Sequence, residues 1–129
     1  MRFLIFSAYY WPEASGTAPF VTAPAEHLVE HGHDVHVVAA YPHYPQWEAL
    51  EPRRPVTRVT HNGITIHRRW HTIPQTQTAK ARALYEGSLL ALGLTALPSV
   101  PRPDAILGVS PALASATLAK AASTVFRRP

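Results

Sequence analysis

Two strand-like segments on either side of a helical segment are the feature that most constrains the fold. Residues 3–8 form a continuous apolar run without the apolar–polar alternation of a half-exposed strand, which is typical of a strand buried on both faces. Residues 34–40, with three valines, predict a second buried strand. Between them Val21, Ala25 and Leu28 recur at helical spacing. The three segments form a βαβ unit, whose right-handed crossover makes the strands parallel.

Two prolines restrict the predicted helix. Pro19 suits its first turn, where the missing N–H leaves no hydrogen bond unmade. Pro24 does not suit a helix interior, so we expect irregular backbone before it, or a kink. The helix is predicted to end at His31, because Gly32 readily adopts the left-handed conformation that closes helices.

Turn residues divide the middle of the chain into a loop and a hairpin. Residues 41–55 contain four prolines and are predicted to be a structured loop. Residues 56–60 and 64–68 flank His61-Asn62-Gly63, and Asn-Gly between β-rich runs predicts a β-hairpin.

The last part of the chain repeats the alternation of helix and strand. A helix is predicted over residues 78–97, followed by a strand over residues 104–110. A second helix is predicted to open at Pro111 and to run to about residue 125. The apolar stripe expected along the first helix consists of Ala83, Gly87, Leu90, Leu94 and Leu97. The whole pattern predicts an α/β fold with a mainly parallel sheet.

Composition limits the chemistry that the chain can perform. Its 129 residues, 47% of them hydrophobic, fit one globular domain. The absence of cysteine excludes disulfides, thiolate metal sites and a thiol nucleophile. The eight histidines lack a carboxylate placed to complete a zinc motif, so we expect no metal site. No nucleophile–base pair stands out either, and the sequence identifies no catalytic residue.

Positive charge is concentrated in one segment of the chain. The formal net charge is +4, and seven basic residues lie between Glu51 and residue 82: Arg53, Arg54, Arg58, Arg68, Arg69, Lys80 and Arg82. Such a segment attracts phosphates, anionic lipid or nucleic acid, or simply forms a solvated face. Because recognised nucleic-acid-binding motifs are absent, we expect no nucleic-acid partner.

Two loops are candidate ligand sites. Residues 9–17, which include Gly16, join the first strand to the first helix, and ligands of open α/β sheets bind beyond the carboxyl ends of the strands. An ordinary connecting turn is the alternative. Trp47 and residues 41–45 could stack on a sugar ring or form a packed proline–aromatic loop, and the sequence leaves both interpretations open.

Five motifs, in order and suitably spaced over almost the whole chain, resemble one enzyme family. It is the retaining GT-B glycosyltransferases of the group 1 (family 4) type, above all those that build bacterial exopolysaccharides. The motifs are Tyr10-Trp11-Pro12-Glu13, Gly32-His33-Asp34-Val35, Tyr41-Pro42-His43-Tyr44-Pro45, the segment from Asn62 to Arg68, and Arg102-Pro103-Asp104 with the following Ser110-Pro111.

The resemblance implies one lobe of a two-lobed enzyme. Residues 1–129 correspond to the amino-terminal, acceptor-side domain, a Rossmann-like three-layer sandwich that carries a hairpin, and the donor domain is absent. The enzyme transfers a sugar from a nucleotide-diphosphate sugar to a saccharide or lipid-linked acceptor, with retained configuration and without a metal or cofactor. Gly16 and Thr17 correspond to the loop that faces the donor phosphates and the acceptor. Tyr44, Ser110 and Pro111 correspond to residues that line the same cleft.

The sequence departs from the family in two respects. Ser15 stands before Gly16 where relatives often have a second glycine, and no pair of glutamates is spaced as in the family's donor domain. We therefore expect a truncated product or a separated domain, inactive alone. A cytoplasmic location, peripheral contact with an anionic membrane and homodimerisation through an uncovered interdomain face are further expectations. The alternative is a stand-alone module for a phosphate or lipid ligand, or a subunit that pairs with a separate donor-domain protein.

Overall fold

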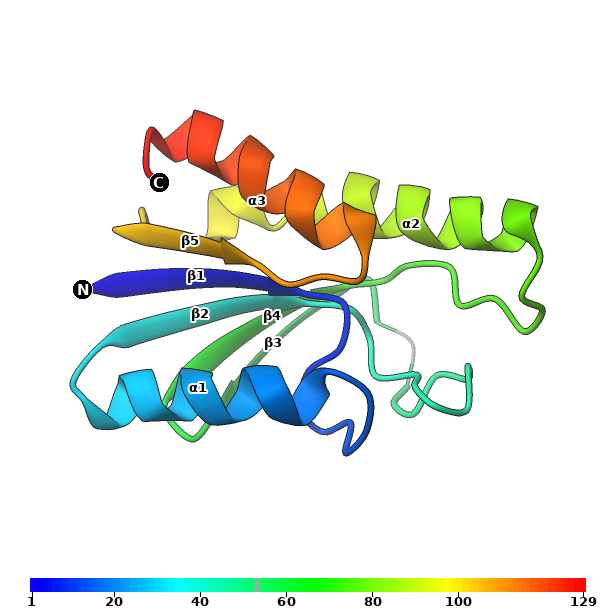
Figure 1. Ribbon diagram of the computed structural model, residues 1–129, viewed down its shortest axis with the longest axis horizontal. Coiled ribbons are helices and arrows are strands. Elements are labelled where there is room, and N and C mark those ends of the chain that lie inside the picture. Colours follow the sequence, from blue (N-terminus) through cyan, green and yellow to red (C-terminus); the bar gives the residue numbers. More distant parts are fainter. Residues whose placement is uncertain (53) are drawn as a thin grey trace.

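A five-stranded sheet lies between one helix on one face and two helices on the other in the computed structural model, which describes residues 1–52 and 54–129 (Figure 1). The elements are β1 (Arg2–Ser7), α1 (Ala18–Glu30), β2 (Asp34–Ala39), β3 (Val56–His61), β4 (Ile64–Arg69), α2 (Ala79–Leu94), the short 3₁₀ helix η1 (Leu97–Ser99), β5 (Ala105–Gly108) and α3 (Leu113–Phe126). The strand order is β3-β4-β2-β1-β5, and every pairing except β3–β4 is parallel. The predicted α/β, Rossmann-like three-layer fold is confirmed.

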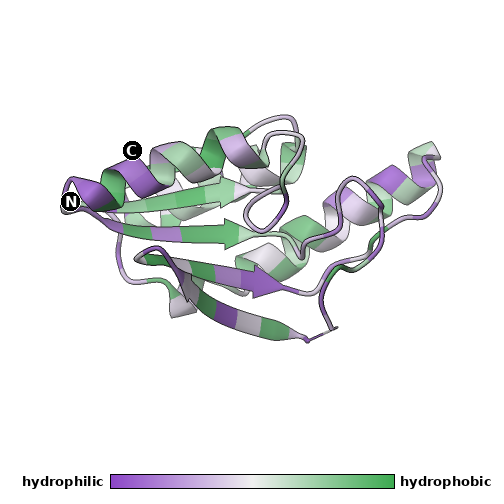
Figure 2. Ribbon diagram, turned by 90° about the horizontal axis from the view of Figure 1, so that it is seen from below, coloured by the Kyte–Doolittle hydropathy of each residue, from purple (hydrophilic) through white to green (hydrophobic). Residues whose placement is uncertain are grey.

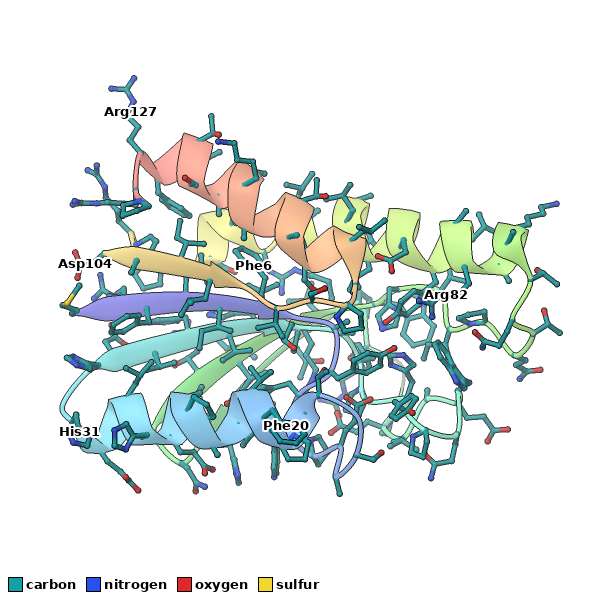
Figure 3. All side chains as sticks on the ribbon, in the orientation of Figure 1. Phe6, Phe20, His31, Arg82, Asp104 and Arg127 are labelled. Atoms are coloured by element: carbon teal, nitrogen blue, oxygen red, sulfur yellow. The ribbon has the colours of Figure 1, made fainter. Side chains whose placement is uncertain are left out.

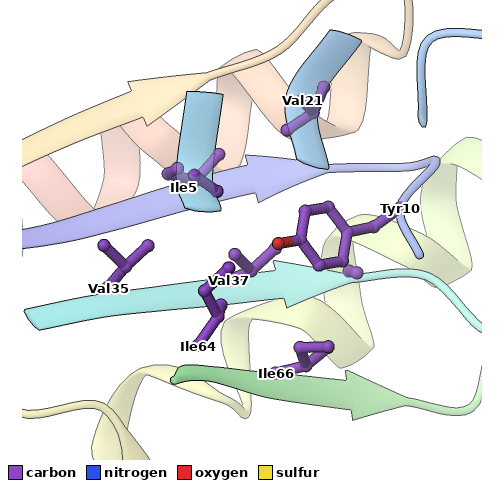
Figure 4. Close-up of a cluster of buried hydrophobic side chains, with 9 residues drawn as sticks. Ile5, Tyr10, Val21, Val35, Val37, Ile64 and Ile66 are labelled. Carbon is purple, nitrogen blue, oxygen red and sulfur yellow. The ribbon is translucent and has the colours of Figure 1, made fainter. Parts of the chain in front are cut away.

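The two strands of the βαβ unit are neighbours in parallel register, with Ile5 opposite Val37. Ile5 and Val37 pack beneath α1, as Figure 4 shows, whereas Leu4 and Val38 face the opposite side with α3. Both faces of each strand are therefore buried. This explains why residues 3–8 read as an unbroken apolar run.

The backbone before Pro24 is regular, so the expected irregularity is wrong. Helix α1 begins at Ala18, with Pro19 in its first turn as predicted, and includes Pro24 in its interior. A proline there removes one helical hydrogen bond, to the carbonyl of Phe20. Pro24 and Phe20 are both exposed, so water can hydrate that carbonyl and the helix continues.

The predicted hairpin is present and turns through two residues with positive φ. Asn62 has φ 47° and Gly63 φ 79°, the signs that a two-residue hairpin turn requires. β4 pairs with β2, so it lies inside the sheet, while β3 forms the edge. In Figure 2 hydrophilic and hydrophobic residues accordingly mix along β3.

The predicted stripe is right only in part, because Leu90 packs against the core and Leu97 of η1 is buried, whereas Leu94 is exposed. Helix α2 itself turns a different set of residues inward. Its buried residues are Tyr85, Leu89 and Gly93, whereas Ala83 and Gly87 are exposed. Leucines occur around most of this helix, so spacing alone does not identify the inner face. Gly93 packs so closely against α3 that a Cβ on it would lie 2.7 Å from Leu118 Cδ1. The inner face of α2 is therefore the face that approaches α3 at Gly93.

Two arginines of the basic segment are buried, which corrects its interpretation as one charged face. Arg68 and Arg69 expose only 1% and 9% of their surface. Arg69 donates from Nε to Thr95 Oγ1 at 3.2 Å and from Nη2 to Ser99 Oγ at 3.1 Å, which ties the end of β4 to the end of α2 and to η1. Arg53 lies outside the described residues.

The edge at β5 carries exposed apolar side chains. Leu107 of β5 and Phe20 of α1 expose 46% and 80% of their surface. The Ile106 N–H donates to the Pro129 carbonyl at 2.9 Å, so the last residue lies along this edge. Pro111 precedes α3, whose N-cap is Ala112, instead of opening the helix as predicted. No helix in the described ranges is long and apolar enough to cross a membrane.

Candidate functional site

The loops that follow β1, β2 and β5 lie at one edge of the sheet, where these parallel strands end (Figure 1). All five residues proposed from the sequence are on these loops: Gly16, Thr17, Tyr44, Ser110 and Pro111. Ligands of open α/β sheets bind at this edge, because loops from several strands meet there and helices begin there. The edge is therefore the candidate functional site.

A buried carboxylate joins the first two loops. Glu13, 6% exposed, accepts at Oε2 from the Tyr10 N–H at 3.1 Å. Its Oε1 accepts from the N–H groups of His43 and Tyr44 at 2.9 and 2.8 Å. Glu13 therefore fixes the loop after β2 against the loop after β1. Sequence reasoning did not assign this role, although Glu13 is the one carboxylate in the first loop.

Arg68 forms a second tie between the same segments. Its Nε donates to the Ala40 carbonyl at 3.1 Å, and its Nη2 donates to the Trp11 carbonyl. Burial lowers the pKa of Arg68 from its usual range, while the carboxylates of Glu51 and Glu13 act in the opposite direction. Nη1 is buried and has no hydrogen-bond partner in the described part of the chain. The Arg68 guanidinium thus holds the two loop backbones together through the Ala40 and Trp11 carbonyls.

Gly16 and Tyr44 are in contact. Gly16 has φ +64°, and a Cβ on it would lie 3.2 Å from Tyr44 Cε1. Thr17 follows as the N-cap residue of α1, where its side chain makes no capping hydrogen bond and its buried Oγ1 has no partner among the described residues. Three of the five predicted residues therefore lie together.

Ser110 and Pro111 lie at the same edge, beyond β5. Both are exposed, and no hydrogen bond within residues 1–52 and 54–129 joins either of them to Tyr44. The structure therefore places them on the candidate edge, with no hydrogen bond to Tyr44 in the described part of the chain.

Among the helices that begin at this edge, α1 and α3 differ in how open their first turns are. The Ala114 N–H in the first turn of α3 donates to Glu86 Oε2 of α2 at 2.9 Å. α1 has no acidic residue in its first turn and no side-chain cap. Free N–H groups and the helix dipole attract anions. The start of α1 is consequently the more open anion site.

An aromatic cluster fills the space between the loop after β2 and helix α2. The His43 ring lies 5.7 Å from Tyr9, 5.2 Å from Trp47 and 5.5 Å from Tyr85, measured between ring centroids. The Arg82 guanidinium carbon is 5.6 Å from the centroid of the Trp47 ring, and Figure 3 shows Arg82 at this edge. The cluster packs residues 41–47, the first half of the loop predicted over residues 41–55, as a structured segment.

The buried histidines of this cluster are held neutral. His43 Nδ1 donates to the Tyr41 carbonyl at 2.6 Å, and burial lowers the pKa of His43. His71 Nε2 accepts from the Tyr41 N–H at 3.1 Å, and burial lowers the pKa of His71 to about 4. His43 is fully buried, so its Nε2, which lacks a hydrogen-bond partner among the described residues, cannot reach a ligand in this conformation. These rings have a structural role.

The groups that the edge exposes can bind a ligand. Glu13 is buried and occupied by three N–H donors, so it positions the loops and is not available as a base. Across the described chain, no three His, Asp or Glu side chains are arranged to hold a metal ion. The open α1 start, the Tyr44 ring and the exposed end of β5 are the groups available to a ligand.

Comparison with known proteins gives one informative relationship. No family model matches the chain. The chain is 31% identical over 116 residues to WcaI of Escherichia coli strain K12, which is named as a colanic acid biosynthesis glycosyl transferase. The match covers 88% of the chain and 28% of WcaI, so the chain spans less than a third of that protein's length. The chain is thus related in sequence to a glycosyltransferase.

Proposed function

We propose that the chain is the acceptor-binding lobe of a retaining glycosyltransferase of the GT-B type. In the complete enzyme, a sugar moves from a nucleotide-diphosphate sugar to a saccharide or lipid-linked acceptor. The sequence similarity to WcaI supports glycosyl transfer in the synthesis of a bacterial polysaccharide. The α/β fold with its loops gathered at one edge supports a ligand-binding lobe.

The observation that carries the proposal is the contact between Gly16 and Tyr44. It brings the loop after β1 and the loop after β2 into one surface. Glu13 and Arg68 hold that surface through backbone hydrogen bonds. A transferase gains rate by holding donor and acceptor in a fixed relative position, and rigid loops are what this requires. The function therefore rests on positioning by this edge.

The donor phosphates are assigned to the first turn of α1, beside Gly16 and Thr17. This turn has no side-chain cap and no acidic residue, whereas the first turn of α3 is occupied by Glu86. The positive end of the helix dipole would stabilise the negative charge that develops on the departing nucleotide. Tyr44, Ser110 and Pro111 are assigned to the walls that receive the acceptor.

A second lobe completes the reaction in this proposal. Sugar transfer needs groups that bind the nucleotide and stabilise charge at the transferred sugar, in addition to an acceptor surface. Glu13, the carboxylate of the loop after β1, is buried and accepts from backbone N–H groups, so it is not accessible as a general base. The alternative, a stand-alone phosphate- or lipid-binding module, is not favoured, because the similarity is to a transferase.

A transfer assay tests the proposal. The chain is joined to the part of WcaI outside the matched segment, and the chimera is supplied with radiolabelled nucleotide sugars and bacterial lipid and saccharide extracts. We expect labelled product with the donor's anomeric configuration from the chimera, and none from the chain alone. Inverted product, or transfer by the chain alone, would refute the proposal.

A further inference from the structure

A polar cavity lies beside the loop after β2, apart from Gly16 and Thr17. Its volume is about 390 Å³, and it is lined by Trp47, Glu48, Ala49, Glu51, Pro52, Ile73 and Gln75. Small-molecule pockets typically measure roughly 300–1,000 Å³. The cavity is therefore large enough for a small ligand, and the interactions described above do not account for it.

We propose that this cavity is a subsite for an uncharged, hydroxyl-rich saccharide unit of the acceptor. An indole gives the C–H face of a sugar ring a rigid apolar surface. The carboxylates of Glu48 and Glu51 accept hydrogen bonds from hydroxyl groups, and the Gln75 amide both donates and accepts. One aromatic face combined with several acceptors suits a ring that is apolar on its faces and rich in hydroxyls on its rim.

The charge of the lining excludes a phosphate group as the preferred ligand. Glu48 and Glu51 place two negative charges on the cavity wall, and like charges repel a phosphate. Arg82 does not line the cavity: its guanidinium carbon lies 5.6 and 5.4 Å from the centroids of the Trp47 and Tyr85 rings. Arg54 lines a neighbouring pocket with Glu51 and Pro52. The cavity thus differs in ligand class from the open first turn of α1.

The Trp47 ring is held in place before any ligand arrives. Trp47 has φ 56°, a left-handed conformation that a bulky residue keeps only when its surroundings determine it. The backbone N–H of Trp47 donates to the His43 carbonyl at 2.6 Å, and the indole ring packs edge-on against the Tyr85 ring, with 5.8 Å between the centroids. Preorganisation of this kind lowers the entropy lost on binding.

The cavity adjoins the proposed transfer site. The rings of Trp47 and Tyr44 are in T-shaped contact at 6.1 Å, and Tyr44 touches Gly16. A saccharide in the cavity would therefore extend from the acceptor end of the site. The subsite identifies a saccharide as the acceptor class of the proposed transferase, and its biological role rests on that proposal. Saccharide binding to the cavity can nevertheless be measured on this chain alone.

Indole N–H signals in two-dimensional NMR test the subsite directly. The chain contains three tryptophans, and Trp11, which is stacked on His61 at 3.7 Å and does not line the cavity, serves as an internal control. We expect millimolar lactose to shift the Trp47 indole and the amides of residues 48–51, and to leave Trp11 unchanged. Glucose 1-phosphate is expected to shift the same signals less than lactose does.

Variants make the result specific. Trp47→Ala should remove the lactose shifts at residues 48–51, whereas Trp47→Phe should keep most of them. Glu51→Gln should weaken binding several-fold while amide dispersion stays native, which separates lost binding from lost folding. Unshifted Trp47 in lactose, equal lactose shifts in Trp47→Ala, or a larger response to glucose 1-phosphate would overturn the subsite. Lactose binding without transfer by the chimera would leave the subsite standing and refute the transferase proposal.

Discussion

The ring of Tyr44 lies so close to Gly16 that a Cβ at residue 16 would be 3.2 Å from Tyr44 Cε1. Gly16 also has φ +64°, which side chains rarely adopt. Any other residue at this position would therefore be disfavoured for two independent reasons, the close approach of its Cβ to Tyr44 and the positive φ. The contact links the loops after β1 and β2, which carry the proposed donor and acceptor contacts.

Replacing Gly16 by alanine should destabilise the chain by about 1–2 kcal/mol, because the left-handed conformation is costly with a Cβ. Urea denaturation measures the effect. Gly87→Ala is the matched control, because Gly87 lies in α2 with nothing within 4 Å of its added Cβ. It should be neutral or stabilise by about 0.5–1 kcal/mol. Equal stability of the two variants would contradict the assigned role of Gly16.

Glu13→Gln should cost about 1–3 kcal/mol of unfolding free energy, because an amide NH₂ cannot accept and leaves a buried N–H unpaired. The carboxylate accepts from three backbone N–H groups, and a glutamine has one acceptor oxygen. The amide signals of His43 and Tyr44 should move with the loss of stability. The control is Glu30→Gln at an exposed position. A Glu13→Gln chain as stable as this control would show that the bridge is unimportant.

Acidification should unfold the chain through its buried histidines. Burial lowers the pKa of both His67 and His71 to about 4, from an ordinary value of 6.5. As the pH falls below 6.5 the unfolded chain binds protons first, so the stabilisation is complete above that pH and is lost on the way to pH 4. We expect a loss on the order of 1–3 kcal/mol per histidine.

Urea denaturation of His71→Gln at several pH values checks this prediction. Its stability should depend less on pH between 6.5 and 4 than that of the unaltered chain. His27→Gln, in which an exposed helical histidine is replaced, should keep the original dependence. A His71→Gln profile identical to that of the unaltered chain would contradict the assignment.

Homodimerisation, expected through an uncovered interdomain face, stays a prediction, and the exposed apolar side chains now point to the β5 edge. Phe20 and Leu107 expose apolar surface there and line an apolar pocket of about 240 Å³. Burial of that surface in a second copy would be favourable. Light scattering should show a dimer that Phe20→Glu shifts to monomer. Leu113→Glu, at an exposed residue of α3, should leave the dimer intact. A monodisperse monomer of the unaltered chain would refute this prediction.

Local patterns were sufficient for most of the fold. The apolar run at residues 3–8 predicted a strand with two buried faces, and Asn62-Gly63 predicted the hairpin turn. The irregular backbone predicted before Pro24 was wrong, because a helix turn that faces solvent tolerates a missing hydrogen bond, whereas a buried turn does not. The inner face of α2 was predicted only in part, because it depends on which neighbour packs there, as Gly93 against Leu118 shows.

The site was predicted only in outline. The position of the loop after the first strand pointed to Gly16, because parallel strands bring their following loops to one edge. Thr17 and Tyr44 came from the resemblance to the glycosyltransferase family. The ties made by Glu13 and Arg68 join residues that are far apart in sequence, such as Glu13 with Tyr44. Charge alone suggested a surface role for Arg68. Its burial follows from the position of β4 beside β2, which the sequence did not specify.

In the proposed enzyme, this lobe selects the acceptor and a second lobe selects the donor. The most direct measurement compares WcaI with the chimera that carries this chain, using one panel of nucleotide sugars and one panel of acceptors. We expect the two enzymes to use the same donors and different acceptors. A chimera with altered donor preference and unaltered acceptor preference would contradict this expectation.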